Sequence, residues 1–315
     1  MVQEKILEVY NLCKYFKIDR KHQFKAVDDV SFFIRKGETL GIVGESGCGK
    51  TTCGRTSIGL YKRNSGTVLF HGKEIEDMKG KEKKKFYQKV QMIFQDPYNS
   101  LDPKMKVERI VSEELRIHQM VQNKNEEKEK VIEILQNVGL HGSYLERYAR
   151  EFSGGQRQRI GIARALAMEP EILVCDEPIS ALDVSIQAQI MNLLIDLKEE
   201  KGLTYIFIAH NLAAVKYISD KIAVMYMGKI VEMGSVEEIY EHPQHPYTVA
   251  LMAAITVPDP HIERQRKKIV LGEVNQIKSA GCQFAPRCPY AKEKCWKEYP
   301  QMKVIAEDHQ VACFL

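Results

Sequence analysis

The stretch that decides the fold is residues 44–51, GESGCGKT, near the start of this 315-residue chain. It fits the pattern G-x-x-x-x-G-K-[ST], which is typical of a loop that binds phosphate groups. The apolar run 39–43 (TLGIV) precedes it and predicts a strand, while 51–60 (TTCGRTSIGL) follows it and predicts a helix. This is the context that the pattern requires. The glycine spacing disfavours a dinucleotide site of the G-x-G-x-x-G kind.

Elementary chemistry assigns a role to each part of this loop. Glycines let the backbone curl so that several N–H groups point inward at phosphate oxygens, and the start of the following helix adds its positive end. Lys50 is expected to reach the β- and γ-phosphates, and the Thr51 hydroxyl is expected to bind Mg²⁺. The predicted nucleotide-binding residues of the loop are Gly44, Ser46, Gly47, Cys48, Gly49, Lys50, Thr51 and Thr52.

Strands and helices alternate along much of the chain. Residues 171–178 (EILVCDEP) and 204–210 (TYIFIAH) are continuous apolar runs, as expected for central parallel strands that are covered on both faces. The segment between them predicts an amphipathic helix that ends at Gly202, and Met227-Gly228 predicts the turn of a later hairpin. The alternation predicts an α/β fold with a right-handed parallel sheet.

Composition limits the functions to consider. The chain has 46 Lys and Arg against 42 Asp and Glu, and its net charge of +4 is too small to indicate a nucleic-acid surface. No stretch approaches the roughly 18–20 continuous apolar residues of a membrane-spanning helix, and the N-terminus lacks the apolar core of a signal peptide. We therefore expect a cytosolic protein that reaches a membrane only through a partner. Its eight cysteines then argue against a disulfide framework.

Two acidic residues, Asp176 and Glu177, end the predicted strand 171–178. A phosphate-loop fold needs a carboxylate at the end of a neighbouring strand to hold the Mg²⁺ shell, and Asp176 fits that role. Glu177 would then lie over the γ-phosphate, where a general base could polarise water. The alternative is an acidic strand end that caps the next turn, and the two residues alone do not decide between these interpretations.

A second glycine-rich segment, residues 152–156 (FSGGQ), stands directly before the predicted helix QRQRIGIARALAM. It has the character of another anion-binding helix start. Two such anion-binding sites in one chain are not expected to bind the same nucleotide. They can do so if two chains associate head to tail, so that each nucleotide lies between the phosphate loop of one chain and the Ser-Gly-Gly of the other.

Six motifs together resemble an ABC transporter ATPase. They are GESGCGKT, Gln95, FSGGQ, ILVCDE, Ser180-Ala181-Leu182-Asp183 and His210, and they follow the order and spacing of that family over roughly residues 5–235. The resemblance implies a phosphate-loop, RecA-like core with an antiparallel β subdomain and a helical subdomain at about 96–157. It implies a nucleotide-binding domain at residues 1–240.

The resemblance also implies roles for individual residues. Gln95 resembles the glutamine that senses Mg²⁺ and couples to the membrane subunit, and His210 resembles the switch histidine that clamps the γ-phosphate. Ser153 and Gly155, with Gln156 beside them, resemble the contacts made to the nucleotide of the partner chain. Asp183 resembles the aspartate that crosses the dimer. Phe16, in preference to Tyr15, resembles the aromatic residue that stacks on adenine, and Phe152 replaces the leucine usual before SGGQ.

The C-terminal residues 241–315 resemble a narrower subfamily, the oligopeptide/dipeptide importer ATPases. The resemblance rests on His245-Pro246-Tyr247-Thr248, on 281–284 (GCQF) and on 287–289 (RCP). The opening LCKYF and the TTCGR after the phosphate loop are more similar to the F-type than to the D-type ATPase. The resemblance implies ATP-driven peptide import at the cytoplasmic face of the membrane. It also implies a second ATPase subunit (a paralogue or a copy), two transmembrane permease subunits and, indirectly, an extracytoplasmic binding protein.

Other functions stay open at this point. Similar ATPases carry other cargo such as nickel, and some ABC ATPases are soluble proteins that act in DNA repair or on ribosomes. Those usually have long coiled-coil insertions or two ATPase cores in one chain, and neither feature is found in this sequence. We expect no nucleic-acid partner.

Four cysteines crowd the last 34 residues with the spacing C-x5-C-x6-C-x17-C, at Cys282, Cys288, Cys295 and Cys313. Thiolates in a reducing compartment suggest zinc or an iron–sulfur cluster. Structural zinc prefers closely spaced cysteine pairs, whereas wide spacing suits a [4Fe–4S] cube, which the subfamily resemblance also favours. Buried thiols without a metal are the third interpretation. His309 could replace one ligand, although a single histidine is more often at the surface or hydrogen-bonded.

Overall fold

The computed structural model describes residues 4–19, 22–254 and 280–315. The chain forms two compact units, each assembled from segments that are separate in sequence. The first unit comprises residues 1–7, 34–38 and 69–208, and the second comprises 8–33, 39–68 and 209–315. Residues 255–279 of the predicted C-terminal extension lie outside the described residues.

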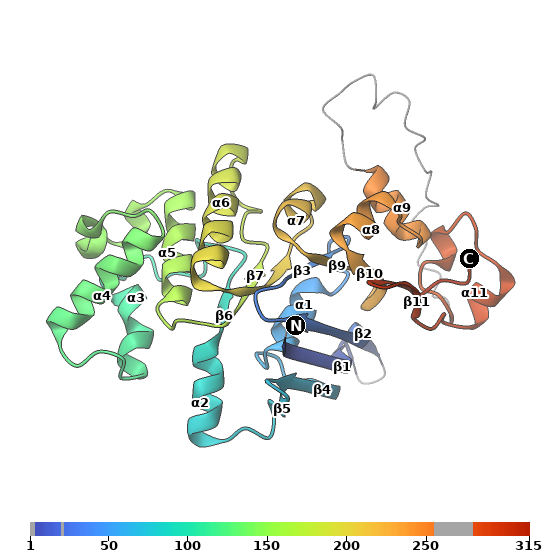
Figure 1. Cartoon of the computed structure of the whole chain (residues 1–315), viewed down its shortest axis with the longest axis horizontal. Coiled ribbons are helices and arrows are strands. Elements are labelled where there is room, and N and C mark those ends of the chain that lie inside the picture. The colour runs from blue at the N-terminus through green and yellow to red at the C-terminus, as the bar shows by residue number, and fades with distance from the viewer. Residues whose placement is uncertain (1–3, 20–21, 255–279) are drawn as a thin grey trace. The chain divides into compact units, whose positions relative to one another are not determined.

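The first unit combines parallel strands with a group of helices (Figure 1). Its elements are β5 (Lys73–Glu74), α2 (Gly80–Lys89), β6 (Val90–Ile93), α3 (Val107–Ile117), α4 (Lys124–Asn137), η1 (Gly142–Glu146), η2 (Ala149–Glu151), α5 (Gly154–Leu166), β7 (Ile172–Asp176), α6 (Val184–Lys201) and β8 (Thr204–Ile208). Strand β7 pairs in parallel with β6 on one side and β8 on the other. Every residue of β7 and β8 is buried, as their continuous apolar sequences predict.

Helices α3, α4 and α5 pack against one another in this unit, as Figure 1 shows in green. Val131, Ile134 and Leu135 of α4 are buried on one face, at the spacing expected for an amphipathic helix. Gly139 follows the helix with φ 71°, and Gly202 ends α6 with φ 63°. Both glycines therefore occupy the left-handed conformation that is favoured at helix ends, and the sequence predicts the end at Gly202.

The second unit contains the phosphate loop and the C-terminal segment. Its strands and helices are β1 (Lys5–Lys17, from residue 8), β2 (Gln23–Arg35, to residue 33), β3 (Thr39–Val43), α1 (Lys50–Ser57), β4 (Ser65–Phe70, to residue 68), α7 (Leu212–Ile218), β9 (Lys221–Tyr226), β10 (Lys229–Ser235), α8 (Val236–Glu241), α9 (Pro246–Ala253), η3 (Ala285–Arg287), α11 (Glu293–Lys297), β11 (Lys303–Ala306) and β12 (His309–Val311).

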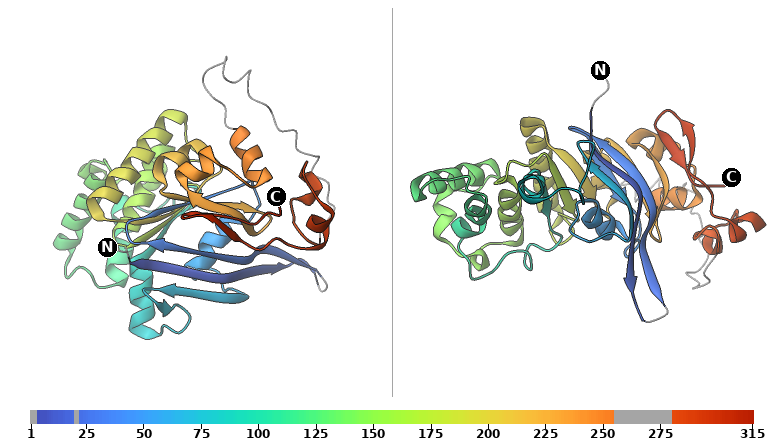
Figure 2. Two further views of the ribbon diagram at one scale, coloured as in Figure 1. Left: turned by 45° about the vertical axis from the view of Figure 1, so that its right-hand side comes forward. Right: turned by 90° about the horizontal axis from the view of Figure 1, so that it is seen from below.

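Two layers of strands are visible in the second unit. Strands β2, β1 and β4 are neighbours in one sheet, drawn in blue (β1 and β2) and blue-green (β4) in Figure 2. In the other, β3 pairs in parallel with β9, and the antiparallel pairs β9–β10, β10–β12 and β12–β11 extend it. Met227 (φ 44°) and Gly228 (φ 84°) form the turn between β9 and β10. Positive φ at both positions matches the twist of a tight hairpin.

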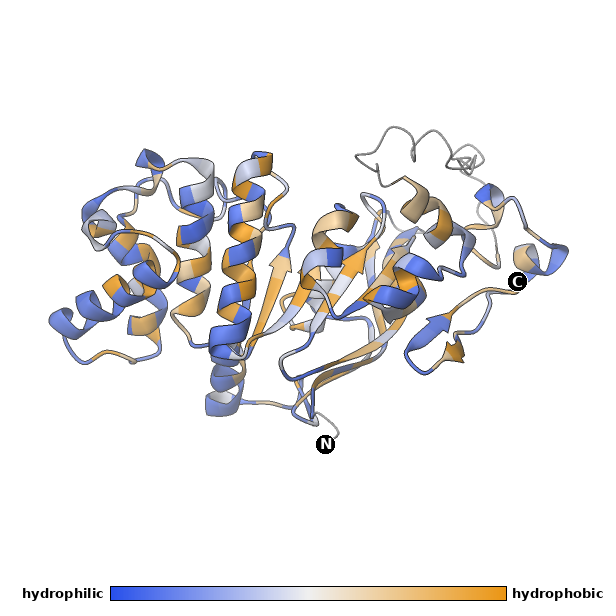
Figure 3. Cartoon of the chain, turned by 45° about the horizontal axis from the view of Figure 1, so that its top comes forward, coloured by the Kyte–Doolittle hydropathy of each residue, from blue (hydrophilic) through white to orange (hydrophobic). Residues whose placement is uncertain are grey.

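The hydropathy of the chain follows this architecture. Figure 3 shows hydrophobic strands inside the units and helices that are hydrophilic on one side. The computed fold confirms the predicted α/β class. The alternating run KILEVYNL (5–12) predicts a strand, and β1 continues beyond it to Lys17. Asn11 takes φ 48° there and its side chain donates to Asp29, so a local irregularity is absorbed without ending the strand.

Candidate functional site

The phosphate loop joins β3 to α1 in the second unit. Its glycines have the left-handed backbone that the sequence predicts, with φ 150° at Gly44, 77° at Gly47 and 107° at Gly49. A Cβ atom on Gly49 would lie 2.0 Å from the carbonyl oxygen of Ala26, and one on Gly44 would lie 2.2 Å from that of Met225. The loop is therefore shaped by close backbone contacts that leave no room for a side chain at these two positions.

Lys50 is buried at the start of α1 and lies across the loop. Its Nζ donates to the carbonyl oxygens of Gly44 at 2.9 Å and of Glu45 at 3.0 Å. Thr51 and Thr52 follow on the same helix and are half-buried, while Ser46 and Gly47 are exposed. The predicted nucleotide-binding residues of this loop are thus gathered around one strand-to-helix turn.

Cys48 is the one thiol within the loop. It is buried, and a Cβ on Gly44 would lie 2.8 Å from its Sγ, so the thiol packs beneath the loop. Burial raises the pKa of the Cys48 thiol. Because the thiolate is the reactive form, this environment disfavours a redox role for Cys48.

Three contacts at Glu45 were missed by the sequence analysis. The Glu45 backbone N–H donates to the Tyr247 hydroxyl at 2.8 Å, and its carboxylate accepts from Arg287 Nη1 at 2.9 and 3.1 Å. The third contact is the one from Lys50 described above. Tyr247 and Arg287 lie in segments that the sequence marked for their subfamily resemblance. No local sequence pattern indicates that Tyr247 or Arg287 contacts Glu45.

The two candidate adenine-stacking residues differ in their surroundings. The Tyr15 hydroxyl donates to Asp28 at 2.6 Å. Phe16 is 38% exposed and meets Tyr61 edge-on, with ring centroids 6.0 Å apart. Phe16 therefore presents an accessible apolar ring, whereas the polar end of Tyr15 is already engaged. This difference makes Phe16 the more accessible ring of the two, and its stacking on adenine stays a prediction.

The predicted hydrolytic residues of the first unit lie at the carboxyl ends of its strands. Asp176 is the last residue of β7 and is fully buried. Glu177 follows it, half-buried, with φ 45°. Gln95, just after β6, donates through Nε2 to Glu177 Oε2 at 2.8 Å. The structure thus brings Gln95 and Glu177 together, and a non-glycine residue with positive φ is a feature that clusters at functional sites.

The FSGGQ segment forms the start of α5. Ser153 is the N-cap, and its hydroxyl accepts from the Gln156 N–H at 3.4 Å while Gln156 Oε1 accepts from the Ser153 N–H at 3.1 Å. This reciprocal arrangement is a capping box. A Cβ on Gly155 would lie 2.6 Å from Ile186 Cγ2, so a larger residue there would force the Ile186 side chain to move. The apolar Phe152 before it is buried.

Asp183 and His210 are both exposed. Asp183 is the N-cap residue of α6, and the next residue, Val184, is 82% exposed. His210 follows β8 and precedes α7, and it belongs to the same unit as the phosphate loop.

The four C-terminal cysteines line one pocket of the second unit, together with His245 and Phe284. Cys282 is brought opposite Cys295 by a backbone hydrogen bond of 2.8 Å from its N–H to the Cys295 carbonyl. Gly281 makes this approach possible, because a Cβ there would lie 2.4 Å from the same carbonyl oxygen. Burial raises the pKa of the Cys282 thiol to about 11 and raises that of Cys288 and Cys313 as well.

His309 is not directed at these cysteines. Its Nδ1 lies 3.0 Å from Glu238 and its Nε2 lies 2.7 Å from Glu232, so both ring nitrogens are engaged. Within residues 4–19, 22–254 and 280–315, no three or more His, Cys, Asp or Glu side chains are grouped so as to hold a single metal ion.

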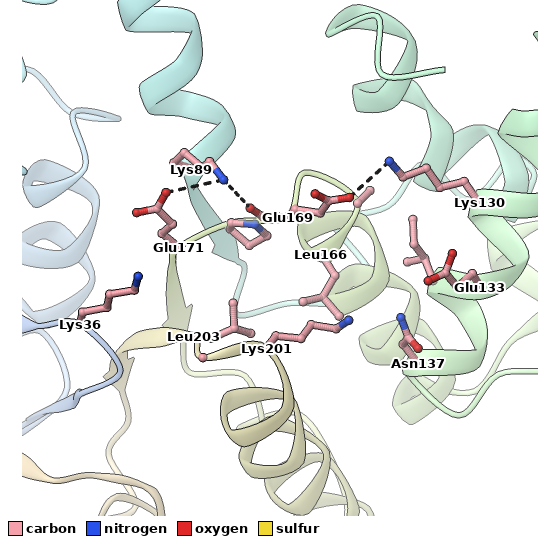
Figure 4. A pocket seen from close by; sticks show the side chains of 14 residues that line it. Lys36, Lys89, Lys130, Glu133, Asn137, Leu166, Glu169, Glu171, Lys201 and Leu203 are labelled. Carbon is pink, nitrogen blue, oxygen red and sulfur yellow. Dashed lines mark hydrogen bonds and ion pairs between the residues drawn. The ribbon is translucent and has the colours of Figure 1, made fainter. Parts of the chain in front are cut away.

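A larger cavity of about 390 Å³ lies elsewhere in the first unit (Figure 4). Its charged lining residues include four lysines and three glutamates. Lys89 pairs with Glu171 at 3.6 Å, and Lys130 pairs with Glu169 at 3.3 Å. None of the predicted site residues lines this cavity, and its opposed charges largely offset one another.

Comparison with known proteins identifies the family. Residues 27–180 match the ABC transporter family, and residues 231–295 match the oligopeptide/dipeptide transporter C-terminal region. The oligopeptide transport ATP-binding protein OppF of Bacillus subtilis is 56% identical over 84% of this chain and 86% of its own length. The OppF of Escherichia coli is 47% identical over 98% and 95%. The chain belongs to the ATP-binding subunits of the oligopeptide/dipeptide ABC transporters.

This ABC subunit also resembles solved cassettes. The structure of cbiO1 from Clostridium perfringens matches with a TM-score of 0.66 and 28% identity, over 76% of this chain and 92% of that one. The cassette MJ0796, in a dimeric post-hydrolysis state with ADP and Pi, matches equally well over 73% and 98%. The family and the F-type resemblance predicted from the motifs are confirmed, and the chain is an ATPase cassette. In its described part, no helix is both long and apolar enough to cross a membrane.

Proposed function

We propose that this ABC subunit hydrolyses ATP to drive the import of di- or oligopeptides. The observation that carries the proposal is a phosphate loop with its glycines and Lys50 in place, in a chain that matches peptide-transport ATP-binding proteins along nearly its whole length. The match at residues 231–295 favours this role over that of a soluble ABC ATPase, since it lies in a transporter-specific region.

The proposed assembly follows from the same relatives. The subunit pairs with a second ATPase, either a paralogue or a copy, and binds two transmembrane permease subunits at the cytoplasmic face of the membrane. An extracytoplasmic binding protein delivers the peptide. The dimeric state of the related cassette MJ0796 supports the pairing. Residues 1–240 then serve as the nucleotide-binding domain, with a helical subdomain at about 96–157 for the permease, and residues 241–315 form the C-terminal extension.

In this proposal, Glu177 is the general base that polarises the attacking water. Gln95 holds the Glu177 carboxylate through their 2.8 Å hydrogen bond, and Asp176 and Thr51 serve the Mg²⁺ of the substrate. His210 contacts the γ-phosphate, and Phe16 stacks on adenine. Across the dimer, the capped start of α5 presents Ser153, Gly155 and Gln156 to the partner's nucleotide, and the exposed Asp183 reaches the partner chain.

The test is Glu177→Gln, assayed with the permease and binding protein in proteoliposomes. ATP binding is expected to be retained, while ATP hydrolysis and uptake of labelled peptide fall at least ~100-fold, because the base is lost and the shape is kept. Glu199→Gln, at the exposed end of α6, is the matched control and should behave as wild type. Near-normal hydrolysis by Glu177→Gln would refute the base assignment. Normal hydrolysis by the wild type without peptide uptake would refute the proposed cargo.

We also propose that Cys282, Cys288, Cys295 and Cys313 hold a [4Fe–4S] cluster, which would lock the C-terminal segment by joining four separate chain positions. One observation supports the fit: the four thiols line one pocket. A cube binds one thiolate at each of four irons and so needs more widely separated sulfurs than zinc does.

The cluster is tested by metal analysis of protein purified without oxygen. We expect about four irons and matching sulfide per wild-type chain. Cys288→Ser should lose them, and Cys13→Ser, far from the pocket in sequence, should keep them. About one zinc per chain, or no metal in either form, would overturn the cluster assignment.

A further inference from the structure

Glu45, the second residue of the phosphate loop, is held by groups from the C-terminal part of the chain. Its carboxylate accepts hydrogen bonds from Arg287 Nη1 at both oxygens, and its backbone N–H donates to the Tyr247 hydroxyl. Its carbonyl oxygen accepts from Lys50, the lysine expected to reach the phosphates. One residue therefore links the loop's phosphate-binding cation to two distant segments.

Arg287 is well suited to fix this position. Its side chain is only 10% exposed, while that of Glu45 is 44% exposed. The guanidinium also approaches the Tyr226 hydroxyl at 3.5 Å. Hydrogen bonding to Glu45 raises the pKa of Arg287, so this cation stays charged at every physiological pH. A guanidinium held by its surroundings loses little freedom when it binds a carboxylate.

Tyr247 is equally constrained. It is 1% exposed and lies in the first turn of α9, where Pro246 occupies an opening position of the helix. The His245 side chain accepts from the Tyr247 N–H at 3.1 Å. The hydroxyl that meets Glu45 is therefore carried by a capped helix rather than by a free loop.

Aromatic packing joins these two residues to the cysteine pocket. The Tyr247 ring lies 4.6 Å from that of Tyr226 and 5.5 Å from that of Phe284, between centroids. Phe284 is 1% exposed and lines the pocket formed by the four cysteines. Close packing transmits displacement, so the C-terminal segment and the loop form one continuous contact path.

We propose that Arg287 and Tyr247 are positioning residues that hold the phosphate loop, through Glu45, in the conformation that binds the triphosphate. The proposal rests on the proposed function, because it concerns ATP binding by the same loop. A loop that is ordered before the nucleotide binds loses less conformational entropy during binding, so it binds the nucleotide more tightly. The C-terminal extension thus sets the ATP affinity of the cassette to which it is attached.

The experiment compares Arg287→Gln, Tyr247→Phe and the wild type as full-length chains. Calorimetry measures the Kd for MgATP, and hydrogen exchange measures the protection of the peptide that contains residues 44–50. We expect both variants to bind ATP about 3–10-fold more weakly, since each loses a hydrogen bond to the loop. Exchange in the loop peptide should rise in both. Arg287→Lys should restore part of the affinity, because it keeps a positive charge opposite Glu45 but not the position of Nη1.

Lys297→Gln is the control, because Lys297 is an exposed residue of the same segment whose ammonium group pairs with nearby Glu293. It should bind ATP as the wild type does. A wild type that binds no ATP would refute the proposed function itself. A wild type that binds ATP, with Arg287→Gln and Tyr247→Phe unchanged in both Kd and exchange, would overturn only the positioning proposal.

Charge neutralisation is the competing explanation for an effect at Arg287, since an unpaired Glu45 carboxylate would repel phosphate. Tyr247→Phe distinguishes charge neutralisation from positioning, because it removes a hydrogen bond without changing any charge. If Arg287→Gln weakens ATP binding while Tyr247→Phe matches the wild type and loop exchange stays constant in both, the positioning proposal is overturned.

Discussion

The buried carboxylate of Glu232 provides a quantitative test of what anchors the C-terminal segment. Glu232 lies on β10, and Oε1 accepts from the Gln244 N–H at 2.7 Å and Oε2 from the His245 N–H at 2.9 Å. His309 Nε2, on β12, lies 2.7 Å from Oε1, and both side chains are at most 1% exposed. The imidazole also reaches Glu238 at 3.0 Å. One carboxylate thus connects β10, β12 and the start of α9.

We predict that His309→Ala lowers the free energy of unfolding of this segment by about 3 kcal/mol. The substitution leaves the Glu232 carboxylate buried without its side-chain partner, and leaving a buried group unsatisfied costs about 1–3 kcal/mol, or more for a charged group. Glu232 is a carboxylate that keeps two backbone donors, so the estimate stays at about 3 kcal/mol. Glu238 is 33% exposed, so water can replace its lost contact and it adds little.

Urea denaturation followed by fluorescence measures this effect. The chain has a single tryptophan, Trp296 in α11, so the signal reports on the C-terminal segment. Glu238→Gln is the matched variant and should cost less than about 1 kcal/mol, because it alters only the exposed end of the network. A loss below about 0.5 kcal/mol for His309→Ala, or an equal loss for both variants, would show that the buried contact does not anchor the segment.

Two further predictions concern the phosphate loop and the helical region. Gly49→Ala should abolish ATP binding as measured by calorimetry, because its Cβ would lie 2.0 Å from the Ala26 carbonyl oxygen, while the helical content of the variant should match that of the wild type. Gly47→Ala is the control and should weaken ATP binding less, because a Cβ at Gly47 would meet open space. In the first unit, hydrogen bonding to Arg116 holds the pKa of Glu127 below its ordinary value. This pair therefore stabilises the fold above a pH of about 4.5, and the contribution is lost as the pH falls through the lowered pKa. Glu127→Gln should accordingly cost about 1 kcal/mol at pH 7 and progressively less below pH 4, as measured by urea denaturation.

Much of the fold was predictable because its signals are local. The fully buried strands β7 and β8 follow from uninterrupted apolar runs, and the turn at Met227-Gly228 and the helix end at Gly202 follow from residues that accept positive φ. In each case the deciding interaction lies within a few residues of the signal. Strand β1 is longer than predicted because the positive φ at Asn11 is stabilised by a hydrogen bond to Asp29, which lies 18 residues away in the sequence.

The candidate site was predictable only where one motif contains its own chemistry. Residues 44–51 specify the loop because glycine, lysine and threonine act within one turn. The bond between Glu45 and Arg287 spans 242 positions, and no local pattern signals a pairing at that separation. His309 illustrates the same limit, since its sequence position allows a metal ligand, a surface residue or a hydrogen-bonded one. Its contacts with Glu232 and Glu238 show that His309 is a hydrogen-bonded residue.

The motifs expected to affect ATP binding and those expected to affect ATP hydrolysis lie in different units. The phosphate loop, His210 and the C-terminal extension belong to the second unit, whereas Gln95 and Glu177 belong to the first. The contacts of Glu45 with Arg287 and Tyr247 lie entirely within the second unit. A change in the extension is therefore expected to alter how tightly ATP is held, and a change at Glu177 is expected to alter how fast bound ATP is cleaved. We therefore expect the extension to set the nucleotide concentration at which ATP binds, and the Gln95–Glu177 pair to set the rate of hydrolysis.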